Sequence, residues 1–319
     1  MKSSELNENR TDPQTPSNSP LKVENTAAQK ASPLRGGLEG SGLAIITGAG
    51  TGMGFEEAKA VAAKGFHTIM ACHHPDRAEA KRLEIVSETG NENVEVMGID
   101  LADLSSVRRF ADEVKARFQH LDLLMNNAGT LATKFQRTKD GLEQTVQVNY
   151  VGPYLLTRLL LPLMGEGSRI VNMVSLTYRI GHLDFPYFFT SGRKGSFWRI
   201  PIYSNTKLAL TLFTFDLANR LKDKGITVNA ADPWIVSTNI IRMHSFIDPL
   251  TDIFFRPLIH TPRQGADTAI HLLLDEDKAS QTGTFNRSNR IVNVGEKFYR
   301  HKQMQELWDA TEALVQKFL

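Results

Sequence analysis

Tyr203 and Lys207 are the two residues of this sequence whose types and spacing are best suited to moving a proton. An apolar stretch, 208–221, follows them and is typical of a continuing helix. Residues four apart in a helix lie on one face of it. Both side chains ordinarily titrate near roughly pH 10. A neighbouring ammonium favours the phenolate, so we expect the pKa of Tyr203 to fall toward the range of a general acid or base. The same pair also occurs on ordinary surface helices, so the interpretation needs support from the rest of the chain.

Composition limits the classes of protein that this chain can be. Its 319 residues are 41% hydrophobic with a formal net charge of +2, which predicts a globular protein and favours neither nucleic acid nor a membrane as partner. The single cysteine, Cys72, excludes an internal disulfide and suits a reducing, cytoplasmic location. No pattern of metal ligands such as His-Glu-x-x-His occurs, so no metal site is expected.

Two segments differ in composition from the rest. Residues 1–40 are polar, without an apolar run, and are predicted to be a disordered tail; their acidic residues argue against a cleaved transit segment. Residues 150–164 form the longest apolar run, but prolines and an arginine interrupt it. It is too short to span a bilayer and is predicted to be a buried helix.

A glycine-rich turn follows the first predicted strand, 43–46. The turn reads Thr47-Gly-Ala-Gly-Thr-Gly-Met-Gly54, and helix-forming residues come after it. Glycines let a phosphate approach the backbone closely, and the start of a helix offers it free N–H groups. The spacing differs from G-x-G-x-x-G because position 53 is Met. Because the turn directly follows the first strand, we expect it to bind a cofactor and not to be only a tight strand-to-helix connection.

Strands and helices alternate along the chain, which predicts a single α/β domain over 41–319 with a doubly wound parallel sheet. The further strands are expected at 67–72, 94–101, 121–126, 169–174 and 226–232, with a last one within 283–294 and a terminal helix at 303–318. Ligands bind at the carboxyl ends of such strands. Those ends carry Gly48, His73, Asp100 and Asn127.

The end of the second strand bears on the choice of cofactor. An acidic residue there binds the ribose of NAD, and a basic one accommodates the phosphate of NADP. His73, His74 and Arg77 favour NADP, whereas Asp76 favours NAD.

Two polar residues and two long segments complete the predicted site. Asn149 lies within a predicted helix, 142–164, where asparagine is unfavourable and needs a reason, and Ser175 follows the fifth strand. Residues 176–201 are predicted to be a loop over the site. The apolar segment 240–262 is predicted to be a lid, followed by a helix at 262–275.

Together and in this order, these pieces resemble the classical short-chain dehydrogenase/reductase family over about 43–319. The matching pieces are Thr47–Gly54, Asp100, Asn126–Gly129, Val148-Asn149, Ser175 and Tyr203-x-x-x-Lys207. Further details look like the retinol dehydrogenase-like branch: Ala71-Cys72, Asp100–Leu104, Thr261–Ala266 and the long gap between Ser175 and Tyr203.

The resemblance implies a Rossmann-like fold and a role for each of four catalytic residues. Tyr203 would exchange a proton with the substrate oxygen, and Lys207 would bind the nicotinamide ribose and lower the pKa of Tyr203. Ser175 would hold the substrate oxygen. Asn149 would place a water that connects Lys207 to solvent.

The resemblance also implies a set of cofactor contacts. Asp100 would contact the adenine, Asn127 the adenosine side, and Thr238 the nicotinamide carboxamide. The full set is Thr47, Gly48, Gly50, Thr51, Gly52, Met53, Gly54, His73, Arg77, Asp100, Leu101, Asn127, Ala128, Gly129, Tyr203, Lys207, Pro233 and Thr238.

Two residues depart from the family pattern. Trp234 stands where the family usually has glycine, and its ring would narrow the nicotinamide pocket or line the substrate site with Ser175 and Tyr203. His73 stands where the branch commonly has arginine, which weakens the case for NADP over NAD.

The sequence thus predicts an NAD(P)-dependent oxidoreductase acting on a carbonyl or alcohol of an apolar substrate. The apolar pocket is inferred from aromatic residues in the two long segments: Phe185, Phe188, Phe189, Trp198, Trp234 and those of the lid. A non-catalytic protein that keeps the cofactor fold is the alternative. The resemblance further implies a homodimer formed through the helices around 149–164 and 203–221.

Overall fold

A computed structural model describes residues 42–192, 197–234 and 260–319. Within these residues one sheet has the order β3-β2-β1-β4-β5-β6-β7-β8. Every neighbouring pair is parallel except the hairpin of β7 and β8. The strands are β1 (Leu43–Thr47), β2 (His67–Cys72), β3 (Val94–Gly98), β4 (Leu123–Asn126), β5 (Arg169–Met173), β6 (Thr227–Asp232), β7 (Phe285–Arg287) and β8 (Arg290–Ile291). The predicted doubly wound sheet is confirmed.

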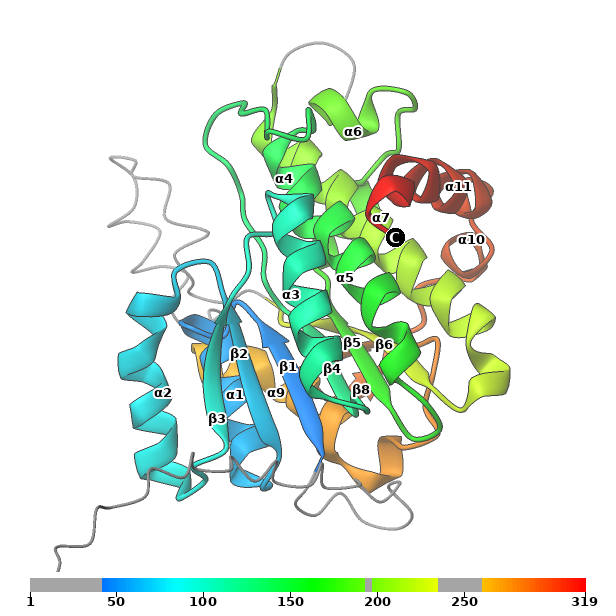
Figure 1. Ribbon diagram of the computed structural model, residues 1–319. Helices are drawn as coiled ribbons and strands as arrows, with labels where there is room; N and C mark the ends of the chain where they lie inside the picture. Colours follow the sequence, from blue (N-terminus) through cyan, green and yellow to red (C-terminus); the bar gives the residue numbers. More distant parts are fainter. Residues whose placement is uncertain (1–41, 193–196, 235–259) are drawn as a thin grey trace, which may run out of the picture. The chain divides into compact units, whose positions relative to one another are not determined.

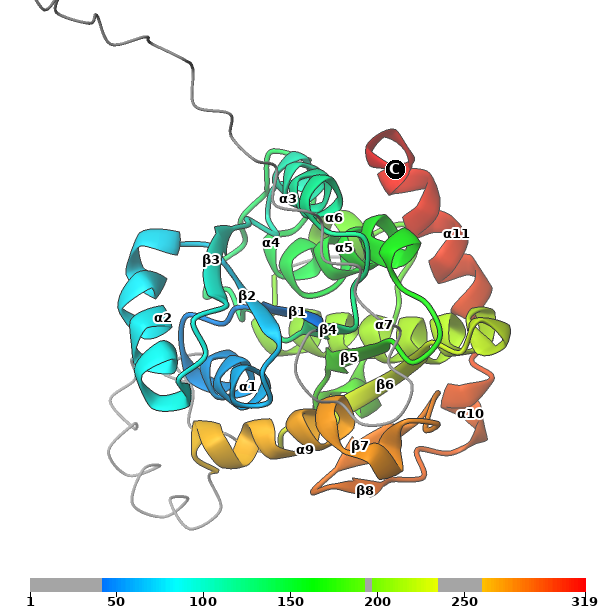
Figure 2. The ribbon, with the colours of Figure 1, turned by 60° about the horizontal axis from the view of Figure 1, so that its bottom comes forward.

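Helices cover both faces of the sheet (Figure 1). One face is covered by α1 (Gly52–Ala63), α2 (Pro75–Thr89) and α9 (Pro262–Leu274), and the other by α3 (Leu104–Arg117), α5 (Gly152–Leu160) and α7 (Arg199–Arg220). Figure 2 shows α1 and α9 side by side beneath the sheet. Every residue of β1, β4, β5 and β6 is buried, because a parallel sheet with helices on both faces exposes neither.

The predicted helix at 142–164 is broken into several pieces. It consists of α4 (Gln144–Val146), a π-helical turn η1 (Gln147–Val151), α5 and a 3₁₀ turn η2 (Leu161–Leu163). Asn149 lies in the π turn. A π turn widens the helix locally and is frequent at functional sites, which supplies a structural reason for an asparagine at this position.

The segment 176–201 is not the irregular loop that its sequence predicts. It contains a 3₁₀ turn η3 (Leu176–Ile180), the short helix α6 (Phe188–Ser191) and the start of α7. Phe188 and Phe189 are buried in the main hydrophobic core, where both rings pack against Phe185 and Phe188 also packs against Tyr150. Two of the aromatics assigned to a substrate pocket are therefore core residues.

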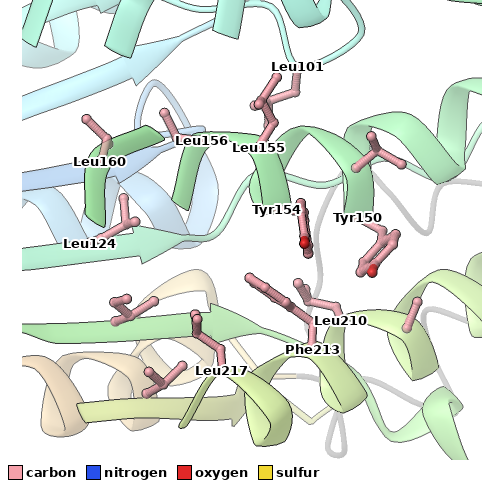
Figure 3. Close-up of a cluster of buried hydrophobic side chains, with 14 of the residues drawn as sticks. Leu101, Leu124, Tyr150, Tyr154, Leu155, Leu156, Leu160, Leu210, Phe213 and Leu217 are labelled. Atoms are coloured by element: carbon pink, nitrogen blue, oxygen red, sulfur yellow. The ribbon is translucent and has the colours of Figure 1, made fainter. Parts of the chain in front are cut away.

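The core between α5 and α7 is rich in aromatic side chains. Tyr150 and Tyr154 face Phe213 of α7 across this core (Figure 3). Helix α11 (Met304–Val315) packs on α7 and contacts Tyr154 of α5, with α10 (Glu296–Tyr299) before it and η7 (Gln316–Phe318) after it. The Tyr154 hydroxyl donates to Glu312 of α11 at 2.6 Å. The ring of Trp308 in α11 stacks on Phe213.

Two further short turns, η4 (Lys222–Lys224) and η6 (Glu276–Lys278), follow α7 and α9. The tail 1–40 and nearly all of the lid 240–262 lie outside the described residues, except that the end of the lid forms the start of α9. Among the described helices, none combines the length and the apolar character needed to cross a membrane.

Glu57 of α1 is a titratable residue in an apolar part of the fold. Its side chain is fully buried, and neither carboxylate oxygen has a hydrogen-bond partner. Burial raises the pKa of Glu57 to about 8. In the folded protein the carboxyl is therefore protonated at neutral pH, because the charged form would be desolvated and unpaired.

This burial predicts a pH dependence of stability. Between pH 4.5 and about 8 the folded protein holds a proton on Glu57 that the unfolded chain releases, so stability falls as pH rises through this window. We expect Glu57→Gln to reduce this pH-dependent decrease in the free energy of unfolding by on the order of 1–4 kcal/mol. Urea unfolding at several pH values measures it. Glu56→Gln, on the same turn but paired with Lys59 at the surface, is the control and should leave the pH profile unchanged.

Candidate active site

The glycine turn after β1 is locked by the residue that follows β4. The Asn127 side chain donates to the Thr47 carbonyl at 2.9 Å, and the Asn127 backbone N–H donates to the Thr47 hydroxyl at 3.0 Å. A Cβ on Gly54 would come within 2.5 Å of both Asn127 Nδ2 and the Gly48 carbonyl oxygen. Gly54 is therefore required by close packing inside the turn, and Asn127 ties β1 to β4.

A cleft of about 630 Å³ opens beside this turn at the carboxyl ends of the strands. It contains many of the predicted cofactor residues: Gly48, Thr51, Gly52, Met53, His73, Asp100, Leu101, Asn127, Ala128 and Gly129. It is also lined by residues that the sequence analysis did not assign to the cofactor: Ala71, Ile99, Ala102, Thr130, Gln144, Val148 and Pro262.

The residues of this cleft fit a dinucleotide. Gly52 has a φ of 61°, and a Cβ there would meet nothing within 4 Å, so the α1 N-terminus is open on the cleft side. Free N–H groups at a helix N-terminus next to open space suit a pyrophosphate. The remaining predicted cofactor residues do not line the cleft: Thr47, Gly50, Gly54, Arg77, Tyr203, Lys207 and Pro233. Thr238 lies outside the described residues.

Polar residues gather at the β2 end of the cleft. His73 Nε2 lies 3.6 Å from Asp100 Oδ2, and the rings of His73 and His74 are 4.2 Å apart. Asp100 also accepts from the Ala102 N–H at 2.8 Å, which fixes the turn after β3. Arg77 is exposed in the first turn of α2.

The four predicted catalytic residues come from three different elements. Tyr203 and Lys207 lie on α7, Asn149 lies on η1, and Ser175 is the N-cap of η3, two residues after the end of β5. The Lys207 ammonium donates to the Met173 carbonyl at 2.8 Å and lies 5.5 Å from the centre of the Tyr203 ring. Helix α7 is thereby fastened to the end of β5 beside Ser175.

Both the oxygen and the nitrogen of the Asn149 side chain form hydrogen bonds within the protein. Its oxygen accepts from the Thr130 N–H at 2.7 Å, and its nitrogen donates to the Thr130 carbonyl at 2.8 Å and to the Thr206 hydroxyl at 3.2 Å. The π turn therefore aims Asn149 at the loop after β4 and at α7 at once. A Cβ on Gly129, which lines the cleft, would lie 3.5 Å from Asn149 Oδ1 and 3.7 Å from Lys207 Nζ.

Trp234 keeps the backbone conformation of a glycine. Its φ is 64°, in the left-handed region that side chains disfavour. Its ring lies 4.8 Å from the guanidinium of Arg287 and is partly exposed. It lines a second cavity of about 530 Å³ with residues of α9 and the β7–β8 turn, and it does not line the cleft beside the glycine turn.

Comparison with known proteins places the chain in a family. The model of the family described as short chain dehydrogenase matches residues 42–245. The chain belongs to the short chain dehydrogenase family. Mouse retinol dehydrogenase 11 is 37% identical over 276 residues, which cover 84% of each chain. Human retinol dehydrogenase 12 is 34% identical over 273 residues, which cover 85% of each chain.

Solved structures share the fold. A crystal structure of an uncharacterized protein from Mycobacterium Paratuberculosis has a TM-score of 0.67 and 29% identity, over 86% of this chain and 93% of that one. A short chain dehydrogenase from Burkholderia cenocepacia J2315, solved in complex with NADP, has a TM-score of 0.61 and 24% identity, over 79% and 96% of the two chains, and shows the same fold.

The predicted membership and the likeness to the retinol dehydrogenase-like branch are therefore confirmed. As a short chain dehydrogenase, the protein is an NAD(P)-dependent oxidoreductase that acts on CH–OH or C=O groups.

The pKa of Tyr203 is higher than the sequence predicts. Burial raises it to about 12, and the buried carboxylate of Asp232 acts in the same direction, while the Ser175 hydroxyl opposes the shift. The expected lowering by Lys207 is absent because this amine loses its proton at a lower pH than Tyr203 does and is neutral where Tyr203 titrates. Desolvation lowers the pKa of Lys207 to about 8, and its ammonium points at the Met173 carbonyl.

Two important residues of this region were missed from the sequence. Asp232 and Arg287 form an ion pair at the ends of β6 and β7, with the Arg287 Nε 2.8 Å from Asp232 Oδ2. One available signal was a carboxylate at the end of an otherwise uncharged strand, 227–232. No sequence signal joins it to an arginine so far along the chain.

The left-handed backbone of Trp234 predicts that a glycine variant at this position is more stable than an alanine variant. At φ 64° alanine is strained and glycine is not, so we expect Trp234→Gly to be more stable than Trp234→Ala by about 1 kcal/mol. Chemical denaturation of the two variants measures the difference. Trp198 is the control, because its φ is −133° and alanine there should be at least as stable as glycine. An equal order at both positions would contradict the prediction.

Proposed function

We propose that this short chain dehydrogenase reduces a carbonyl, or oxidises the matching alcohol, with Tyr203 exchanging the proton. The observation that carries the proposal is the position of Gly129. It lines the cleft beside the glycine turn and lies next to both Asn149 and Lys207. Gly129 supports the proposal because it brings the cofactor cleft next to two of the four predicted catalytic residues.

In the proposed mechanism each side chain has a separate task. A bound nicotinamide supplies or accepts the hydride, and the protein orients the substrate and moves the proton. Tyr203 keeps its proton at neutral pH and donates it to the substrate oxygen during reduction. Ser175 binds that oxygen. Lys207 holds the ribose and, with Asn149, forms the route by which Tyr203 regains a proton.

An apolar substrate is supported by side chains near Tyr203. Ile200 lies one turn before Tyr203 on α7 and is 48% exposed, and Trp198 directly before α7 is 59% exposed. The Arg199 guanidinium ties this turn to the Leu131 carbonyl at 3.2 Å, next to the loop that carries the exposed Phe135. The relatives at 34–37% identity are named for retinol, an alcohol with a long hydrocarbon chain.

We propose NADP as the preferred cofactor, with NAD as the alternative. No acid follows β2 directly, and His73, His74 and Arg77 provide donors for a ribose phosphate. Asp100 lies close to His73 and partly offsets this preference.

We further propose a cytoplasmic location, in keeping with the unpaired, buried thiol of Cys72. The homodimer remains a proposal, and it would have to use surface of α5 and α7 that α11 does not cover.

Replacing Tyr203 tests the chemical step. We expect Tyr203→Phe to lower kcat by about 10²–10⁴-fold while the Kd for NADPH stays within about twofold, because only the proton donor is lost. A panel of apolar ketones and aldehydes supplies substrates. Tyr187→Phe, at an exposed tyrosine, is the control and should keep wild-type turnover. Near-normal turnover of Tyr203→Phe would refute the proton assignment.

A fluorescence titration with NADPH and NADH tests the cofactor. We expect NADPH to bind more tightly, and His73→Arg to increase the preference by about tenfold, because a guanidinium binds a phosphate with two parallel hydrogen bonds. His67→Arg, at the other end of β2, should leave the preference unchanged. Binding of neither cofactor would instead favour the non-catalytic alternative.

A further inference from the structure

The ion pair between Asp232 and Arg287 lies at the carboxyl ends of two neighbouring strands. Asp232 ends β6 and is only 1% exposed, and Arg287 ends β7 as its partner in register. Two nitrogens of the guanidinium approach the same oxygen, Asp232 Oδ2, at 2.8 and 2.7 Å. A carboxylate this deeply buried requires a charged partner with good geometry.

The other groups around this carboxylate belong to the two turns that flank the site. Asp232 Oδ1 accepts from the Trp234 N–H at 3.1 Å. Burial raises the pKa of Asp232, and the Leu176 N–H is one of the groups that oppose this rise by favouring the charged carboxylate. Leu176 directly follows Ser175. One side chain therefore reaches the backbone of the turn after β5 and of the turn after β6.

Arg287 holds the second of these turns from its outer side. Its guanidinium lies 4.8 Å from the Trp234 ring, a distance at which a cation is attracted to the face of an indole. The backbone of Trp234 is strained at a φ of 64° and persists only because the surroundings determine it. The N–H contact to Asp232 and the ring contact to Arg287 are two such restraints.

The sheet connects this arrangement to the predicted reacting centre. The Val174 N–H donates to the Ala231 carbonyl at 2.9 Å, one residue before both Ser175 and Asp232. Asp232 is also close enough to act on the charges of both Tyr203 and Lys207. Asp232 is thus linked through the sheet to the residue before Ser175 and acts on two further predicted catalytic residues, Tyr203 and Lys207.

We propose that Asp232 and Arg287 are positioning residues that hold the Ser175 turn and the Trp234 turn in the geometry that the reaction needs. The proposal rests on the proposed function, in which Ser175 binds the substrate oxygen. A buried ion pair adds little net stability, because desolvation offsets the attraction. Its contribution here is to fix the geometry of the two turns. A small displacement of groups at a reacting centre lowers the reaction rate strongly.

A double-mutant cycle with Ser175 tests this role. We expect Asp232→Asn to lower kcat about tenfold in the otherwise wild-type enzyme, with the Kd for NADPH within about twofold. In the Ser175→Ala enzyme the same change should cost less than about twofold, because the hydroxyl that the pair positions is already absent. An equal loss in both backgrounds would show a general structural effect and overturn the proposal.

A second variant protects the test against misfolding. Arg287→Lys keeps the charge but loses the planar contact to Trp234 and one of the two nitrogens on Asp232, so we expect kcat to fall about threefold, with no change in thermal unfolding beyond a few degrees. Arg290→Lys, on the adjacent β8, is the matched control. Equal kcat in these two variants would also overturn the proposal.

The result with Tyr203→Phe separates this inference from the proposed function. Wild-type turnover of Tyr203→Phe would refute the proposed chemistry itself. Loss of turnover in Tyr203→Phe combined with an additive cycle at Asp232 and Ser175 would refute only the positioning pair.

Discussion

The parallel register of the sheet is the constraint on which the rest of this structure depends. Because the strands β1, β4, β5, β6 and β7 run in one direction, all of them end at the same edge. The residues that follow or end them are therefore neighbours in space: Gly48, Asn127, Ser175, Asp232 and Arg287. A shift of one residue in any pair would turn these side chains to the opposite face.

Burial at this edge determines the protonation of the site. It raises the pKa of Tyr203 to about 12 and lowers that of Lys207 to about 8, because both charged forms lose hydration. The buried Asp232 raises both values and is itself held by Arg287. A phenol that stays protonated at neutral pH is the form that a carbonyl reduction requires. The lysine is the group of the pair that titrates nearer to neutral pH.

Most of the fold was predictable because its signals are local. The strands at 67–72 and 169–174 and the helix after Thr261 were predicted to within a residue or two of their observed bounds. The predicted helix at 142–164 was wrong in detail, since its π turn depends on contacts of Asn149 with Thr130 and Thr206. Phe188 was assigned to a pocket but lies in the core, because composition does not show which side of a segment is covered.

The sequence by itself determined the order of the motifs: the glycine turn, Asn149, Ser175 and the pair Tyr203 and Lys207. These are short-range patterns, and each follows from backbone freedom or helical spacing. Only the tertiary structure decided the rest. Asp232 pairs with Arg287 across 55 residues, and the Tyr154 hydroxyl donates to Glu312 across 158 residues. Such contacts arise from strand order and helix packing, and a linear sequence contains no periodic signal for them.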